Sequence, residues 1–171
     1  MADEYTLLAR ASFEQFTRTG QRLHLADGVA PELVEQRAAC FVSLHKNGEL
    51  RGCIGTLVPV QENLAEEIIE NAISACSRDP RFPAVQEDEL AGIDCSVDVL
   101  SEPEDIESTE DLDVKRYGVI VSKGLRRGVL LPDLEGVDTV EEQVRIAKAK
   151  AGIFDSEHVH LQRFEVIRHK E

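Results

Sequence analysis

A cation, a thiol and two glycines lie together in the segment Arg51-Gly52-Cys53-Ile54-Gly55-Thr56. Glycine inside a strand weakens pairing and leaves one face unfilled, so two glycines around one cysteine indicate that another group comes close to the backbone there. A reactive cysteine with a neighbouring guanidinium would fit this composition. The alternative is a β-bulge or strand end that holds a buried cysteine.

This segment is predicted to be the return strand of a hairpin. Residues 39–45 alternate in polarity, and the Asn47-Gly48 pair that follows favours a type I′ turn. A two-residue turn sets Lys46 opposite Glu49, Leu44 opposite Arg51, Val42 opposite Cys53, and Cys40 opposite Gly55. Arg51 and Cys53 then share a face, where the guanidinium lowers the pKa of the thiol. A hairpin register shifted by one residue would turn all of these side chains to the opposite face, and this expectation would no longer hold.

A second cation, Arg81, lies in the stretch Asp79-Pro80-Arg81-Phe82-Pro83. Each proline disfavours helix at the residue before it, so this stretch is a stiff strap after a helix. One interpretation makes Arg81 an anion-binding side chain that Asp79 orients, on the rim of a pocket with Arg51. The other is a salt bridge and a helix-terminal charge that only fix the strap.

The segment 51–56 resembles the signature of the AMMECR domain family, whose bacterial and archaeal members are called AmmeMemoRadiSam system protein A. Supporting similarities span about residues 5–168: they are residues 79–83, Ser96-Val97, Leu100-Ser101, Pro103, 128–132 and 150–152. Two departures follow Pro132, where Asp133 replaces the usual Gln and residues 134–136 are short and acidic. The resemblance implies association with a radical S-adenosylmethionine protein and a Memo-like protein in a three-part system. It implies no firmly established activity.

Two hypotheses about function follow. In the first, Cys53 is a nucleophile or redox thiol, Arg51 lowers its pKa, and Arg81 holds a carboxylate or phosphate, with the backbone near Gly52 and Gly55 as oxyanion donors. No histidine can be assigned as its general base. In the second, the same groove, including Asp79, is a non-catalytic module that binds a peptide, a small anion or a partner protein. Whether the chain is an enzyme is left open.

The remaining pattern predicts an α+β fold with a mainly antiparallel, mixed sheet and packed helices, in a single domain over residues 1–171 that has at most a small second lobe. The expected elements are helices at 3–19, 61–76 and 139–152, strands at 93–101 and 158–167, a second hairpin at 117–131, and connectors at 21–32 and 102–115. Cys76 and Cys95 are expected in the core, and Glu62, Glu66, Glu67 and Glu70 away from it.

Three further signals bear on ligands. His158 and His160 would share a strand face, which suits metal binding, but no third ligand is evident, so we expect no metal and no cofactor. The cluster of Lys123, Arg126 and Arg127 would contact an acidic partner or simply be solvated. The common nucleotide-binding, hydrolase and metalloprotease motifs are not found.

The composition of the 171-residue sequence is that of an ordinary globular protein, with 42% hydrophobic and 30% charged residues. Its net charge of −14 opposes binding to nucleic acid or to an anionic membrane. No signal-peptide pattern and no membrane span are evident, so a cytoplasmic protein with four free thiols is expected.

Overall fold

The computed structural model describes residues 1–26 and 28–171. Within it the chain forms two compact units, the first made of residues 1–100 and 167–171, and the second of residues 101–166. The single domain expected from the sequence stays a prediction, and the two units are described separately.

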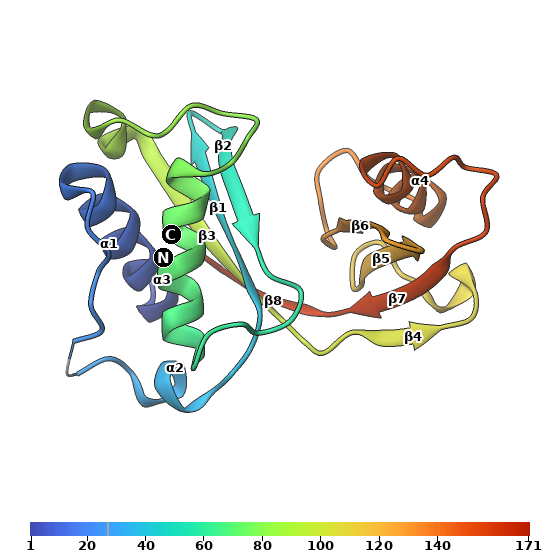
Figure 1. Cartoon of the computed structure of the whole chain (residues 1–171), viewed down its shortest axis with the longest axis horizontal. Helices are drawn as coiled ribbons and strands as arrows, with labels where there is room; N and C mark the ends of the chain where they lie inside the picture. Colours follow the sequence, from blue (N-terminus) through green and yellow to red (C-terminus); the bar gives the residue numbers. More distant parts are fainter. Residues whose placement is uncertain (27) are drawn as a thin grey trace. The chain divides into compact units, whose positions relative to one another are not determined.

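Unit 1 contains a four-stranded sheet, sheet 1, with strand order β2-β1-β3-β8 (Figure 1). Its elements in chain order are α1 (Glu4–Thr19), α2 (Pro31–Glu35), β1 (Cys40–Lys46), β2 (Glu49–Gly55), α3 (Leu64–Ser77), a 3₁₀ helix (Glu87–Gly92), β3 (Ile93–Leu100) and β8 (Val166–Lys170). Strand β1 pairs antiparallel with both β2 and β3. Strand β2 is therefore an edge strand.

Helices α1 and α3 pack together on one face of sheet 1 and form its core. Alternate residues of β1 and β3, such as Val42 and Val97, point toward these helices and are fully buried. Cys76 and Cys95 are buried in this core, as predicted. Helix α1 begins after the cap residue Asp3 and ends at Gly20, whose φ of 72° is the left-handed value typical of a helix C-terminal cap.

The β1–β2 hairpin has the predicted turn but not the predicted register. Asn47 and Gly48 both have positive φ, 54° and 80°, as a type I′ turn requires. Lys46 pairs with Glu49 and His45 with Leu50, but a β-bulge then shifts the register so that Leu44 pairs with Gly52. Arg51 is the extra residue, and Cys53 faces Ser43 instead of Val42. The predicted partners of Arg51, Cys53 and Gly55 on β1 are therefore wrong.

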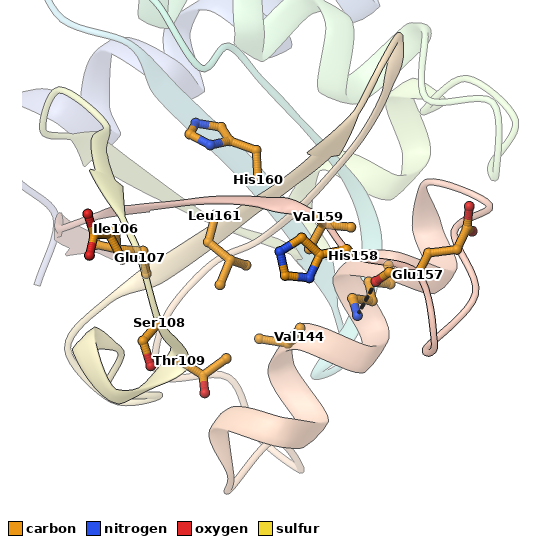
Figure 2. Close-up of a pocket in the computed structure, with 11 residues that line it drawn as sticks. Ile106, Glu107, Ser108, Thr109, Val144, Glu157, His158, Val159, His160 and Leu161 are labelled. Carbon is orange, nitrogen blue, oxygen red and sulfur yellow. Dashed lines mark hydrogen bonds between the residues drawn. The ribbon is translucent and has the colours of Figure 1, made fainter.

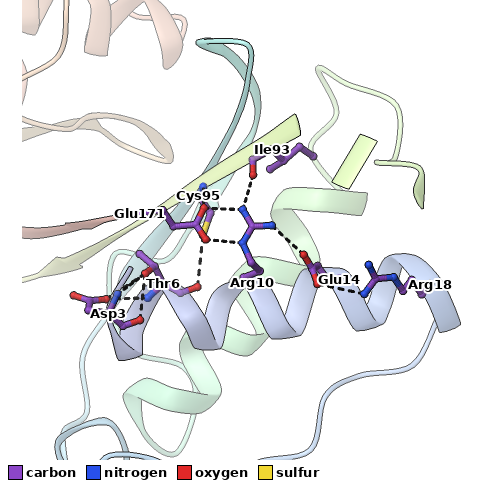
Figure 3. A network of polar contacts seen from close by, with 8 residues as sticks. All are labelled: Asp3, Thr6, Arg10, Glu14, Arg18, Ile93, Cys95 and Glu171. Atoms are coloured by element: carbon purple, nitrogen blue, oxygen red, sulfur yellow. Dashed lines mark hydrogen bonds and ion pairs between the residues drawn. The ribbon is translucent and has the colours of Figure 1, made fainter. Parts of the chain in front are cut away.

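A polar network joins Glu171, the residue after β8, to α1 and β3 (Figure 3). The Glu171 carboxylate accepts hydrogen bonds from Arg10 Nε at 2.5 Å, from Arg10 Nη2 at 2.7 Å and from the Cys95 backbone N–H at 2.9 Å. Arg10 also donates to the carbonyl oxygen of Ile93. These contacts hold residues far apart in the sequence in one unit.

Unit 2 contains sheet 2, with strand order β4-β7-β5-β6, and one covering helix. Its elements are β4 (Glu104–Ile106), a 3₁₀ turn (Thr109–Asp111), β5 (Gly118–Lys123), β6 (Arg126–Leu130), α4 (Val140–Lys150) and β7 (His160–Phe164). Helix α4 packs on β5 and β6 over a separate hydrophobic core. Its N-terminus is capped by Thr139, whose side chain accepts from the Glu142 N–H.

The predicted α+β class is confirmed, but the strands are divided between two sheets. Two local predictions in this part of the chain are wrong. The connector at 102–115 includes β4 and a 3₁₀ turn, and the final strand is divided at Glu165 into β7 and β8. In the described residues, no helix is both long and apolar enough to cross a membrane.

Candidate functional site

The strap after α3 covers the exposed edge of β2 at Cys53. The Asp79 carboxylate accepts the Cys53 backbone N–H at 3.0 Å, and Arg81 Nη2 lies 3.4 Å from the Cys53 carbonyl oxygen. Both backbone groups of Cys53 therefore point outward from the sheet, where an edge strand would otherwise leave them unpaired. In an antiparallel ladder such a residue belongs to a non-hydrogen-bonded pair, in which the two side chains lie closer together.

Arg81 is held in one orientation by Asp79. Its Nε and Nη2 donate to the two carboxylate oxygens at 3.0 and 2.8 Å, and its guanidinium lies 5.5 Å from the Phe82 ring centroid. The hydrogen bonds from Arg81, together with the Cys53 N–H, lower the pKa of Asp79 to about 2. The Asp79 side chain is 2% exposed and that of Arg81 55%. Among the described residues, none forms a hydrogen bond with Arg81 Nη1, so this edge of the guanidinium is available to a ligand.

The Cys53 side chain lies on the face of sheet 1 opposite α1 and α3. We call this the polar face and define it by Ser43, Cys53, Ser96 and Asp98. The Cys53 Sγ is 3.2 Å from Ser43 Oγ, and Ser43 pairs in turn with Ser96 on β3. Asp98 is buried and binds Arg168 through Nε at 2.7 Å.

The thiol of Cys53 is not activated in the way predicted. Burial raises its pKa above the ordinary value, and the hydrogen bond from Ser43 and the charge of Arg81 oppose this effect only in part. The nearby carboxylates Asp98 and Asp79 raise the pKa further. Cys53 is thus a neutral, partly buried thiol, while the other three cysteines are buried.

Arg51 is bound to other groups and does not activate the Cys53 thiol. Its Nε and Nη2 form a bidentate pair with Glu89 at 3.0 and 3.1 Å, and its Nη1 donates to the Pro83 carbonyl oxygen at 2.8 Å. This pairing lowers the pKa of Glu89 to about 2. The bulge turns Arg51 toward the strap, so its role in the structure is to hold residues 80–83 against β2. The predicted effect of Arg51 on the thiol pKa is wrong.

The two glycines of the segment are explained by packing. A Cβ at Gly52 would lie 2.1 Å from the Ala75 carbonyl oxygen of α3, and a Cβ at Gly55 would lie 2.3 Å from the Phe41 ring. Gly52 therefore allows α3 to approach the strand closely, and Gly55 leaves room for an aromatic ring. Their proposed use as oxyanion donors is not needed to account for them.

Glu67 was expected away from the core, and its burial was not predicted. It is 1% exposed and accepts hydrogen bonds from Thr56 Oγ1 and from the backbone N–H groups of Val60 and Gln61. The carboxylate thereby fixes the loop that follows the 51–56 segment. The missed residues on the polar face are Ser43 and the Asp98–Arg168 pair. The alternation of polar and apolar residues along β1 places Ser43 on the polar face. The sequence holds no signal that Asp98 and Arg168 form a pair.

One of the two histidines and two of the three basic residues have partners within unit 2. His160 Nε2 lies 2.9 Å from Asp105 Oδ1, and Lys123 and Arg126 both form ion pairs with Glu157. In residues 1–26 and 28–171, no three His, Cys, Asp or Glu side chains are grouped so as to hold a metal ion. The expectation of no metal stays a prediction.

Comparison with known proteins identifies the family. A protein of Thermotoga maritima is 53% identical over 168 residues, which are 97% of each chain. A protein of Clostridium acetobutylicum is also 53% identical, over 99% of this chain but only 36% of its own length, so the chain spans about a third of that relative. The crystal structure of an uncharacterized protein from Pyrococcus horikoshii matches all of this chain and 93% of its own, with a TM-score of 0.91 and 32% identity. The AMMECR1 family profile matches residues 6–169, and the chain therefore belongs to the AMMECR1 family.

Proposed function

We propose that this chain is a recognition module of the AMMECR1 family, and that the edge of sheet 1 at Cys53 and Arg81 binds an acidic group of a partner protein. The observation that carries this proposal is that the Arg81 side chain is held in one orientation and is nevertheless exposed. A buried carboxylate fixes its guanidinium, yet more than half of the side chain is exposed and one nitrogen is available. A cation fixed in advance loses little side-chain entropy when it binds a carboxylate.

The chemistry at Cys53 favours binding over catalysis. A nucleophilic cysteine acts as thiolate, whereas here burial and two carboxylates keep the thiol neutral. The thiol and the Ser43 hydroxyl supply a weak donor and acceptor beside the guanidinium. In this proposal they set the shape and polarity of the site, and Arg81 supplies its charge.

The comparison with Clostridium acetobutylicum supports a protein partner. That relative contains further chain beyond the matched 36% of its length, so a close homologue of this module is covalently joined to additional protein. We propose that the present chain meets the corresponding protein as a separate molecule. Resemblance to AmmeMemoRadiSam system protein A suggests the partners, a Memo-like protein and a radical S-adenosylmethionine protein, in a system located in the cytoplasm.

The test is a calorimetric titration of the chain with the Memo-like protein and with the radical S-adenosylmethionine protein of the same organism. Arg81→Gln should weaken binding by roughly tenfold or more, because a charge-assisted hydrogen bond is lost. Arg78→Gln is the matched control, since Arg78 lies three residues away with a similar exposed fraction of 57%. The affinities of the two variants for the partner protein should differ clearly.

The outcomes separate the two parts of the proposal. Binding of neither protein would exclude these partners. Binding that Arg81→Gln and Arg78→Gln weaken equally would place the interface elsewhere. Arg81→Lys keeps the charge but loses the bidentate contact with Asp79, so its affinity should fall between those of wild type and Arg81→Gln.

A further inference from the structure

A hollow of about 300 Å³ lies within unit 2, between α4, β7 and the segment that follows β4 (Figure 2). This volume is at the lower end of the range for small-molecule sites. The floor consists of apolar side chains, which are Ile106, Val144, Val159 and Leu161. All four belong to the unit 2 core or pack against it. The hollow is thus a place where part of that core is left uncovered.

A positive charge without an acidic partner lies at one end of the hollow. Lys148 Nζ donates to the backbone carbonyl oxygens of Asp155 at 2.9 Å and Glu157 at 3.1 Å. Within the described part of the chain, no carboxylate lies within 4.0 Å of this ammonium. Two carbonyls leave one of its three N–H groups for another acceptor. The ammonium is therefore held in place but not neutralised.

The other charged groups around the hollow are neutralised or directed elsewhere. The Glu157 carboxylate is paired with Lys123 and Arg126 at 3.3 and 2.9 Å. His160 is paired with Asp105, and Figure 2 shows its ring on the far side of β7 from Leu161. Figure 2 also shows the Glu107 side chain extending away from the hollow. Apart from Glu107, which lines the hollow with its side chain directed away, the local charge left there is that of Lys148.

The polar groups at the rim are suited to donating hydrogen bonds. The His158 ring lies beside Val144 and Val159 in Figure 2. At the opposite end are the hydroxyls of Ser108 and Thr109. Ser108 Oγ accepts the Glu110 N–H at 3.1 Å, which leaves its own proton available. Donors and a cation around an apolar floor are complementary to an anion with an apolar body.

We propose that this hollow binds a small organic acid, with the carboxylate on Lys148 and the apolar body on Val144, Val159 and Leu161. In this proposal the His158 ring, which lines the same hollow, donates to the second carboxylate oxygen. The hollow is lined by residues of unit 2, whereas Cys53 and Arg81 belong to unit 1. This proposal does not depend on the function proposed above.

The test is an NMR titration of the ¹⁵N-labelled full chain with 3-phenylpropionate and with its neutral amide, 3-phenylpropanamide. We expect saturable shifts confined to the amides of residues 106–109, 144–148 and 157–161. The carboxylate should bind about tenfold more tightly than the amide, because only the carboxylate forms a charge-assisted hydrogen bond with Lys148.

Two variants and one control variant make the test specific. Lys148→Gln still offers an N–H group to the backbone carbonyls, and it should abolish the preference for the carboxylate. Lys150→Gln is the matched control, because it removes the same charge from α4 at a residue that does not line the hollow. Val144→Phe should fill the hollow and remove the shifts with both probes. Shifts that do not saturate, that lie elsewhere, or that are insensitive to Lys148→Gln would overturn the proposal.

Discussion

Replacement of Gly52 by Ala tests whether this glycine is required for the packing of α3 against β2 or for chemistry at its backbone. The new Cβ would lie 2.1 Å from the Ala75 carbonyl oxygen, whereas an ordinary contact begins at 3.4 Å. Strand and helix would therefore have to separate by about 1.3 Å, the difference between these two distances. Overpacking of this kind costs roughly 1–3 kcal/mol, and the upper end applies because the obstacle is backbone that cannot rotate away.

A smaller effect acts in the opposite direction. Alanine restricts the unfolded chain more than glycine does, which stabilises the fold by about 0.4–1 kcal/mol where the native backbone suits it. The net loss in the free energy of unfolding should then be about 2 kcal/mol. With a urea m-value of roughly 2 kcal/mol/M, the unfolding midpoint should fall by about 1 M.

The assay uses the cysteines of unit 1 as probes. Cys40, Cys76 and Cys95 are all buried, so brief thiol labelling at increasing urea concentration reports the unfolding of this unit alone. Gly92→Ala is the control, because a Cβ at Gly92 meets nothing within 4 Å and its backbone is outside the left-handed region. Equal midpoints for Gly52→Ala and Gly92→Ala would refute the packing explanation and reopen a role for the Gly52 backbone in chemistry.

Two further predictions concern titration. Burial raises the pKa of the Cys53 thiol above its ordinary value, so native alkylation at pH 7 should proceed at only a small fraction of the rate of the fully ionised thiol, yet faster than at the buried cysteines. Residue-resolved mass spectrometry across pH checks this, and a fast phase with an apparent pKa near 6 would contradict it. Asp79 has a folded pKa of about 2 against an ordinary 3.8, so its ion pair stabilises the fold above about pH 4, and this contribution is lost as the pH falls toward 2. Asp79→Asn should therefore weaken the pH dependence of urea unfolding between pH 4 and 2, by roughly 1–2 kcal/mol after allowance for the exposed Arg81, while unchanged pH dependence would show that the pair contributes nothing.

Much of unit 1 could be predicted because its signals are local. The Asn47-Gly48 turn and the apolar face of α3 both depend on residues close together in sequence, and both are confirmed. The bulge at Arg51 could not be predicted. A turn fixes the register only where the ladder begins, and one extra residue changes the face of every side chain that follows.

The errors at the site have tertiary causes. Glu67 looks like a surface residue on the helical repeat, but it is buried because three donors in the loop after β2 converge on it. Glu89, the partner that directs Arg51 away from the thiol, lies 38 residues along the chain. The break between β7 and β8 likewise reflects pairing with different sheets, which residues 158–167 do not reveal on their own.

The chain order of unit 1 has a consequence for biosynthesis. Strand β3 ends at Leu100, and residues 101–166 of unit 2 are made before the ribosome reaches most of β8. At 5–20 residues per second this interval lasts on the order of 3–13 s. During that time one edge of β3 has no partner strand, and Arg10 has no Glu171 to bind. An unpaired edge invites association with other chains, so a nascent chain stalled within unit 2 should depend more on chaperones than a finished one.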